Sequence, residues 1–180
     1  MTQPRRERRR LTHVDRGGRP RMVDVSDKPA TARRAVAEGL VTLEHETLSA
    51  IVDGTLAKGD LLTVAEMAGV MGAKRTAELI PLCHPIALTD LAVEITPDRT
   101  AGGLRIRATA ATVAPTGVEM EAMTAVSIAA LTVYDMVKGV DRSAAIAGVR
   151  LLEKSGGRSG EWRQDGPRRA RATRGPCRGG

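Results

Sequence analysis

Leu91-Ala-Val-Glu-Ile-Thr96 and Leu104-Arg-Ile-Arg-Ala-Thr-Ala110 are the two stretches that decide the fold. Apolar residues occupy every second position in both, which is the period of a strand with one buried face. Between them lies Pro97-Asp-Arg-Thr-Ala-Gly-Gly103, whose residues are typical of a turn. Together the three segments predict a β-hairpin.

Helical patterns lie on both sides of this hairpin. A helix of about twenty residues is predicted over 118–138, between Gly117 and Gly139. A second helix is predicted to begin at Asp60, a good N-cap, and to end before Pro81. We expect an apolar stripe on it and a set of small residues for close helix packing. The stripe comprises Val64, Met67, Ala68, Met71 and Leu79, and the small residues are Ala65, Ala68, Gly69 and Gly72.

The remaining elements complete an α+β pattern. Strands are predicted over 37–43 and 144–152, and a short helix over 46–53. The order strand, two helices, two strands, helix, strand matches a split βαβ arrangement with one added helix. The predicted fold class is therefore α+β: a ferredoxin-like sandwich, with a mostly antiparallel sheet and helices packed on one face.

The core must be aliphatic. The chain has 180 residues and is 42% hydrophobic, but it contains no Phe, one Trp and one Tyr. Aliphatic side chains bury less area than aromatic ones, so a domain of this size gains from burying further surface between subunits. We expect an oligomer on this ground.

The basic residues are concentrated at the two ends. Residues 1–10 carry a net charge of +4 and residues 163–180 carry +5, which leaves −2 on residues 11–162. Arg-rich segments with little apolar content favour solvated disorder, and a nonspecific contact with nucleic acid is the alternative. We therefore predict one folded domain over 11–162, flanked by a disordered basic extension at 1–10 and a disordered Arg/Gly-rich tail at 163–180.

The composition also bears on the cellular compartment. Two cysteines, Cys83 and Cys177, do not make a disulfide framework, and no run of about 18 apolar residues predicts a membrane span. The basic N-terminus is not followed by the apolar segment of a signal peptide. We expect a cytoplasmic protein that does not contact a membrane.

Polar residues in two turn-rich segments are candidates for chemistry. Lys58 stands just before the predicted helix start at Asp60, where a phosphate could bind, although an ordinary solvated lysine fits as well. Two prolines bracket Leu82-Cys83-His84, and His84 could contact a substrate or transfer a proton, or simply stabilise a rigid loop. A metal site is not expected, because no second Cys/His pair accompanies this one.

The long helix and the segment after the last strand carry further candidates. Glu121 and Asp135 are fourteen residues apart and point within roughly 40° of each other on a helix. Asp135 and Lys138 are neighbours on one face, either as a surface ion pair or, if partly buried, as an acid/base pair. Gly156-Gly-Arg-Ser-Gly160 is either a flexible connector or a loop around a phosphate.

In combination these segments strongly resemble the cyclic pyranopterin monophosphate synthase family, the C protein of bacterial molybdenum-cofactor biosynthesis. The resemblance spans about residues 11–162. The most specific matches are Leu79-Ile-Pro-Leu-Cys-His-Pro85, Thr116-Gly-Val-Glu-Met-Glu-Ala122 and Tyr134-Asp-Met136. Other matches are Leu11-Thr-His-Val14, Met22-Val-Asp-Val-Ser26, Lys58-Gly-Asp60, Ala73-Lys-Arg-Thr76, Lys138 and Val149-Arg-Leu-Leu-Glu-Lys-Ser-Gly-Gly157.

The resemblance implies a reaction and an assembly. The substrate would be (8S)-3′,8-cyclo-7,8-dihydroguanosine 5′-triphosphate, and the products cyclic pyranopterin monophosphate and pyrophosphate. The enzyme would be a lyase without a cofactor or a resident metal. It would form a homohexamer, a trimer of dimers, with the active site at a subunit interface.

The resemblance also implies roles for individual residues. Asp135 corresponds to the catalytic acid/base, with Lys58 and Lys138 as its partners. Substrate-binding segments correspond to Leu82, Cys83 and His84 and to Met120 and Glu121, with Glu119 adjoining them. Basic positions that can hold the triphosphate correspond to Lys28, Arg33, Lys74 and Lys154.

Two other functions stay open at the level of sequence. A nucleic-acid-binding protein would use the Arg-rich ends, but residues 11–162 lack the net basic charge and the aromatic residues that single strands stack on. A structural subunit that has lost catalysis would keep the fold, but the presence of Lys58, Asp135 and Lys138 argues against it.

Overall fold

The computed structural model describes residues 13–15, 17–56, 59–158 and 160–164. The predicted basic extension at 1–10, most of the predicted tail at 163–180 and the candidate Lys58 lie outside these residues. The elements in chain order are β1 (Thr31–Thr42), α1 (His45–Val52), α2 (Leu61–Lys74), α3 (Thr76–Leu79), β2 (Asp90–Asp98), β3 (Gly103–Ala114), α4 (Glu119–Val137), β4 (Ala145–Ser155) and β5 (Trp162–Arg163).

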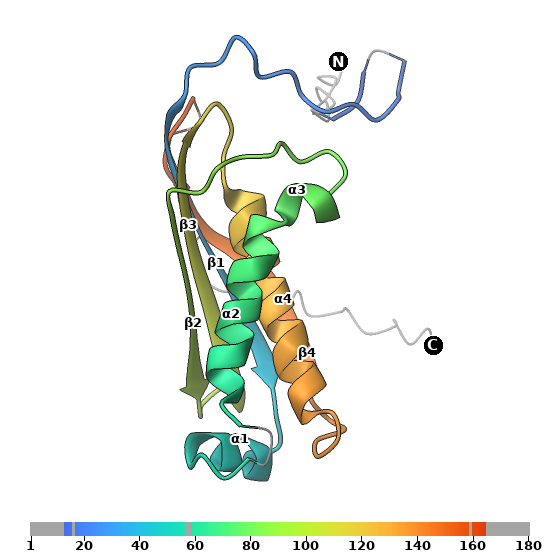
Figure 1. Cartoon of the computed structure of the whole chain (residues 1–180), viewed down its shortest axis with the longest axis vertical. Coiled ribbons are helices and arrows are strands. Elements are labelled where there is room, and N and C mark those ends of the chain that lie inside the picture. The colour runs from blue at the N-terminus through green and yellow to red at the C-terminus, as the bar shows by residue number, and fades with distance from the viewer. Residues whose placement is uncertain (1–12, 16, 57–58, 159, 165–180) are drawn as a thin grey trace, which may run out of the picture.

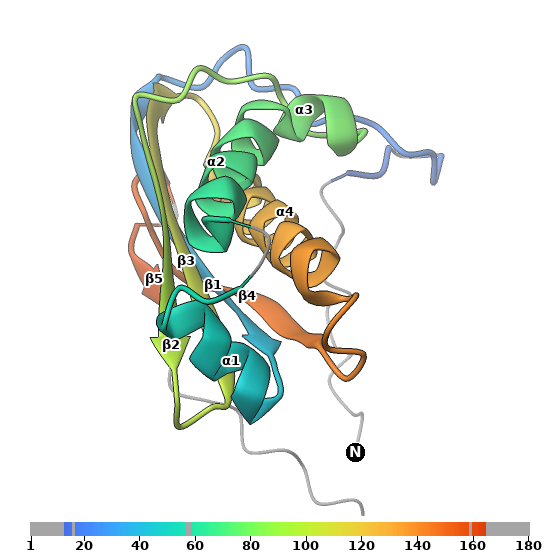
Figure 2. The same ribbon diagram turned by 60° about the horizontal axis from the view of Figure 1, so that its bottom comes forward.

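The strands form one antiparallel sheet with helices on one face, which confirms the predicted α+β class (Figure 1). The order β2-β3-β1-β4-β5 places β1 between β3 and β4, and helices lie in the connections β1-to-β2 and β3-to-β4. This is the split βαβ arrangement with an additional short edge strand. Figure 2 shows α1, α2 and α4 on the same side of the sheet.

The hairpin forms as predicted. β2 and β3 pair in register from Asp90 opposite Ala111 to Asp98 opposite Gly103. The alternating apolar residues of β3 are completely buried, and those of β2 are buried or half-buried against the helices. The completely buried residues are Leu104, Ile106, Ala108 and Ala110.

Several predicted boundaries were wrong in the same way, because strand pairing extends past the apolar pattern. β1 begins at Thr31 instead of residue 37, since its polar first half pairs with the end of β3. β4 runs to Ser155 instead of residue 152 for the same reason. The strand β5 was not predicted, because its two residues carry no periodic signal.

The predicted apolar stripe of the second helix was also wrong. Asp60 does cap α2, with its carboxylate accepting the amide of Thr63 at 3.1 Å. However, Val64, Met67 and Met71 are exposed, and α2 ends at Lys74, so Leu79 belongs to the separate helix α3. The buried face consists of Leu61, Ala65, Gly69, Gly72 and Ala73.

Small residues face α4 because the two helices lie very close together. A Cβ atom on Gly72 would lie 2.6 Å from Cγ1 of Ile128, which is closer than real Cβ contacts come. At Gly69 the same atom would lie 3.0 Å from the carbonyl oxygen of Ala125. This close packing holds α2 along α4 and places the start of one beside the end of the other (Figure 1).

Candidate active site

A hollow of about 580 Å³ lies at one end of the molecule, where the loop after α3 meets the start of α4. It contains five of the residues that the sequence predicted to bind substrate: Leu82, Cys83, His84, Glu119 and Met120. Segments separated by about 35 residues thus converge as expected. The other lining residues are His13, Ile80, Pro81, Thr116 and Gly117, which were not assigned a role although they lie in or beside the matched stretches.

The loop after α3 contacts the N-terminal arm, which comprises residues 13–15 and 17–30, beside this hollow. Nε2 of His84 lies 2.7 Å from the carbonyl oxygen of Val23, so the imidazole donates its proton there. The arm turns back on itself through a bridge between Val14 and Pro20, and His13 reaches the lining. His84 therefore links the arm to the hollow.

Glu121 lies beneath the hollow and is not part of its lining. Its side chain is 3% exposed, and the thiol of Cys83 donates to its Oε1 at 3.8 Å. Its other carboxylate oxygen, Oε2, is buried and has no hydrogen-bond partner among the residues that the structure describes. Burial raises the pKa of Glu121, and burial together with the negative charge of Glu121 raises the pKa of the Cys83 thiol.

A basic cleft adjoins the hollow. It measures about 40 Å³, and its lining includes Arg33, Lys154 and Glu119. The ammonium of Lys154 contacts Oε1 of Glu119 at 2.8 Å. Gly157 packs on Arg33 so tightly that a Cβ atom there would overlap the guanidinium. Two of the four predicted phosphate-binding residues thus lie together, whereas Lys28 and Lys74 line neither the hollow nor the cleft.

The predicted catalytic pair lies at the other end of α4. Lys138 donates to Asp135 at 2.5 Å, and the side chains are 57% and 68% exposed. The hydrogen bond and charge of Asp135 raise the pKa of Lys138. Within this chain the pair is an exposed ion pair, so the partly buried alternative is not observed. Fourteen residues of helix separate Glu121 from Asp135, or about 21 Å along the axis.

The predicted alignment of Glu121 and Asp135 on one helix face does not give them a shared environment. Glu121 is buried, whereas Asp135 is exposed. An angular offset of roughly 40° is enough to move a side chain from the buried sector of a helix to its boundary with solvent. A single chain therefore does not bring the catalytic pair to the hollow.

Comparison with known proteins decides the family. The family model described as the MoaC family matches residues 22–157. The chain belongs to the MoaC family. Its curated relatives include proteins named cyclic pyranopterin monophosphate synthase from Brucella ovis, Brucella melitensis biotype 2 and Brucella abortus strain 2308. Each is 54% identical over 158 residues, which cover 88% of this chain and 96% of the relative.

The stretch matched to the MoaC family includes the basic cleft, the Asp135–Lys138 pair and the hollow. Of the residues that line the hollow, His13 lies outside this stretch. Among the residues that the structure describes, no group of three or more His, Cys, Asp and Glu could hold a metal ion. Helix α4 is long and apolar enough to cross a membrane, but it is the central helix of the fold, packed against α2 and the sheet.

Proposed function

We propose that this chain is a lyase of molybdenum cofactor biosynthesis. It converts (8S)-3′,8-cyclo-7,8-dihydroguanosine 5′-triphosphate to cyclic pyranopterin monophosphate and releases pyrophosphate. The observation that carries this proposal is the 54% identity to proteins named cyclic pyranopterin monophosphate synthase, over 88% of the chain. The convergence of Leu82, Cys83 and His84 with Met120 at one hollow supports it.

Asp135 acts as the acid/base, with Lys58 and Lys138 as its partners. The contact of 2.5 Å between Lys138 and Asp135 supports this assignment, because a carboxylate paired with an ammonium can exchange a proton with a molecule bound beside the pair. Lys58 is assigned from the matched stretch Lys58-Gly-Asp60, which immediately precedes the capped start of α2.

The active site is shared between two chains of a homohexamer built as a trimer of dimers. The separation of about 21 Å along α4 between Glu121 and Asp135 supports sharing, since a second chain is needed to bring a catalytic pair to each hollow. Apolar side chains exposed on α2 and α4 give such an assembly a surface to bury. They are Val64, Met67, Met71, Leu131 and Tyr134.

The triphosphate binds at the basic cleft through Arg33 and Lys154, with Lys28 and Lys74 contributing charge. A triphosphate carries about four negative charges, so several cations must gather around it. The cleft shares Glu119 and Gly117 with the hollow, which supports a phosphate-binding surface that adjoins the ring-binding surface. A slightly acidic domain would otherwise repel this ligand.

Two kinds of chemistry are required. A sugar hydroxyl attacks the α-phosphorus, its proton passes to a base, and the bond from that phosphorus to the pyrophosphate oxygen breaks. Positioning of the phosphate chain and electrostatic stabilisation supply most of this rate. The rearrangement to the pyranopterin needs proton transfers at the ring, for which Asp135 and the two lysines are suited. Neither step needs a cofactor. We place the protein in the cytoplasm.

The test is to supply the purified protein with the cyclised nucleotide and to measure pyrophosphate release. Asp135→Asn should reduce the rate by about 10²- to 10⁴-fold, because it removes the acid/base group while keeping the shape of the side chain. Asp90→Asn, a matched change at an exposed aspartate outside the site, should leave the rate unchanged. Absence of pyrophosphate with the unaltered protein would refute the proposed function.

A further inference from the structure

Glu119 stands in the wall between the hollow and the basic cleft. Its side chain lines both, beside Cys83 and His84 on one side and beside Arg33 and Lys154 on the other. A carboxylate is an unexpected group to find at the entrance to a cleft that is proposed to bind phosphates. Its position requires a physical reason.

The carboxylate of Glu119 is held in the cleft by two features. Oε1 accepts a hydrogen bond from the Lys154 ammonium at 2.8 Å, and the two side chains are only 28% and 32% exposed. Gly117 leaves room for the carboxylate, since a Cβ atom at that position would overlap it. The side chain is therefore folded back across Gly117 towards Lys154.

The cations of the cleft are arranged for a larger anion than this one carboxylate. Nε of Arg33 is buried and has no hydrogen-bond partner within the described part of the chain, although Nη2 of the same guanidinium reaches the carbonyl oxygen of Pro115 at 3.5 Å. The cleft has a volume of about 40 Å³, enough for only a few water molecules. Within this cleft the Glu119 carboxylate fills the place beside the Lys154 ammonium.

We propose that Glu119 is an internal competitor anion that sets how strongly a phosphate ligand must bind before this cleft accepts it. In the free protein its carboxylate occupies the position at Lys154 that a phosphoryl group of the substrate takes. A bound polyphosphate displaces it, and the displaced carboxylate turns into the hollow that it already lines. This inference rests on the proposed placement of the triphosphate at Arg33 and Lys154.

Competition of this kind sets a threshold for binding. If the cleft is open in only a fraction of the molecules, every phosphate ligand binds more weakly by that same fraction. A polyphosphate has several charges and makes several contacts, so it binds strongly enough to displace the carboxylate. A ligand with a single phosphoryl group does not. Removing the charge of Glu119 should therefore tighten all phosphate ligands by a common factor.

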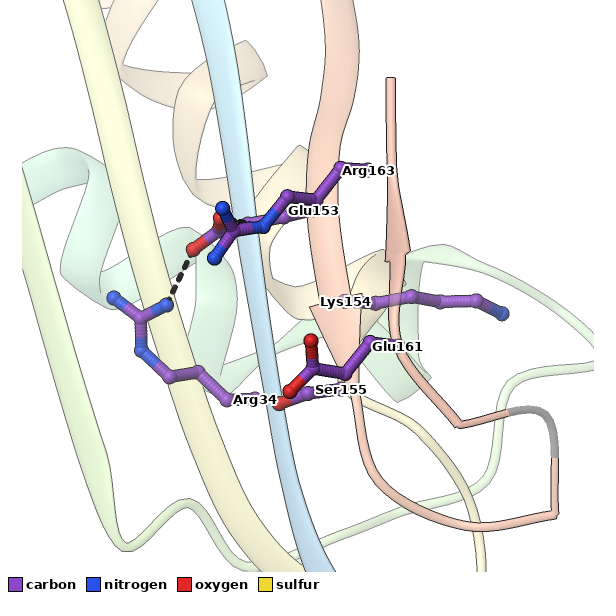
Figure 3. Close-up of a pocket in the computed structure, with 6 residues that line it drawn as sticks. All are labelled: Arg34, Glu153, Lys154, Ser155, Glu161 and Arg163. Carbon is purple, nitrogen blue, oxygen red and sulfur yellow. Dashed lines mark hydrogen bonds and ion pairs between the residues drawn. The ribbon is translucent and has the colours of Figure 1, made fainter. Parts of the chain in front are cut away.

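The test is calorimetric titration of the full-length protein with inorganic pyrophosphate and, separately, with orthophosphate. Glu119→Gln should tighten both by about ten-fold, which corresponds to a cleft that is open in roughly a tenth of the molecules. The matched control is Glu94→Gln. Glu94 is exposed on β2, the edge strand at the far side of the sheet from β5, and lines neither the cleft nor the hollow. Glu153 would not serve, because its carboxylate contacts Arg34, which also lines the cleft (Figure 3).

The outcomes separate the inference from the proposed function. Tighter binding by Glu119→Gln, with Glu94→Gln within about two-fold of the unaltered protein, supports an internal competitor. If Lys154→Met weakens pyrophosphate binding but Glu119→Gln does not tighten it, the phosphate placement stands and the competitor is refuted. If Lys154→Met binds pyrophosphate as well as the unaltered protein, or if no form binds it, the placement itself fails and the competitor fails with it.

Discussion

Glu121 is the clearest residue at which burial and charge oppose each other. The side chain is almost fully buried, and its Oε1 accepts a hydrogen bond from the thiol of Cys83. Its Oε2 has no partner among the described residues. A carboxylate in such surroundings is more easily held neutral than charged. The raised pKa of Glu121 follows from this burial, with the negative charge of Glu119 adding to it.

A raised carboxyl pKa makes stability depend on pH in a defined direction. As the pH rises past the ordinary glutamate pKa, the unfolded chain ionises before the folded one, so the folded state loses stability until the raised pKa is reached. Glu121→Gln should therefore unfold at a higher temperature than the unaltered protein near pH 8, by roughly 2–4 °C for each kcal/mol recovered. The difference should shrink towards about pH 4, where both states are protonated.

Thermal unfolding followed by circular dichroism across this pH range checks the prediction. Glu78→Gln, at an exposed glutamate of α3, should show no comparable pH-dependent difference. A Glu121→Gln variant whose unfolding temperature stays parallel to that of the unaltered protein at every pH would show that Glu121 is not held neutral.

At the scale of elements, the packing of α2 on α4 is the feature that the apolar pattern misrepresented. Large side chains at Val64, Met67 and Met71 suggested the buried face, but the face that packs consists of alanine, glycine and one leucine. Small side chains allow two helix axes to approach closely, and this approach compensates for the area that larger residues would bury. The large residues are thereby left on the outer surface.

Gly72→Ala tests this close approach. An alanine normally stabilises a helix by about 0.5–1 kcal/mol relative to glycine. Here the added Cβ would lie 2.6 Å from Cγ1 of Ile128, so the clash should outweigh the gain and lower the unfolding temperature by several degrees. Gly139→Ala is the control, because nothing lies within 4 Å of a Cβ atom at that position. Equal unfolding temperatures for the two variants, measured by calorimetry, would contradict the close packing of Gly72 against Ile128.

At the scale of the whole molecule, the two halves of the site lie at opposite ends of α4. The hollow with His84 and the cleft with Lys154 are at the start of the helix, whereas Asp135 and Lys138 are at its end. In a two-fold dimer, if one surface of the first chain contacts a different surface of the second, the reverse contact also forms, so each chain can complete the site of the other. The proposed sharing can then be tested without knowing the interface.

Mixed oligomers of His84→Ala and Asp135→Asn chains should regain activity that neither variant has alone. With random pairing, half of the dimers are mixed, and one of the two sites in each mixed dimer is intact, so about a quarter of the activity should return. Mixing Asp135→Asn with Lys138→Met provides the control, since these residues contact each other at the same end of one chain. Recovery in the control mixture, or none in the first mixture after mixing is verified by mass spectrometry, would contradict the sharing.

The sequence by itself determined the type and order of the main elements. The hairpin, α1, the Asp60 cap and α4 follow from periods of two and 3.6 residues and from local capping and turn residues, which need no knowledge of distant contacts. Five residues of the hollow were also predicted, because they lie in short motifs matched to the family: Leu82, Cys83, His84, Glu119 and Met120. Extended strand ends and β5 had no comparable local signal, and His13 was not assigned a role although it lies in a matched stretch.

Only the tertiary structure decided what each side chain meets. It assigned the small-residue face of α2 to the interior, placed Glu121 beneath the hollow rather than in its lining, and paired Glu119 with Lys154 across 35 residues of chain. It also separated Asp135 from the hollow that it was predicted to serve. Burial and electrostatic contact depend on distances between segments remote in sequence, and the local pattern along one segment does not specify those distances.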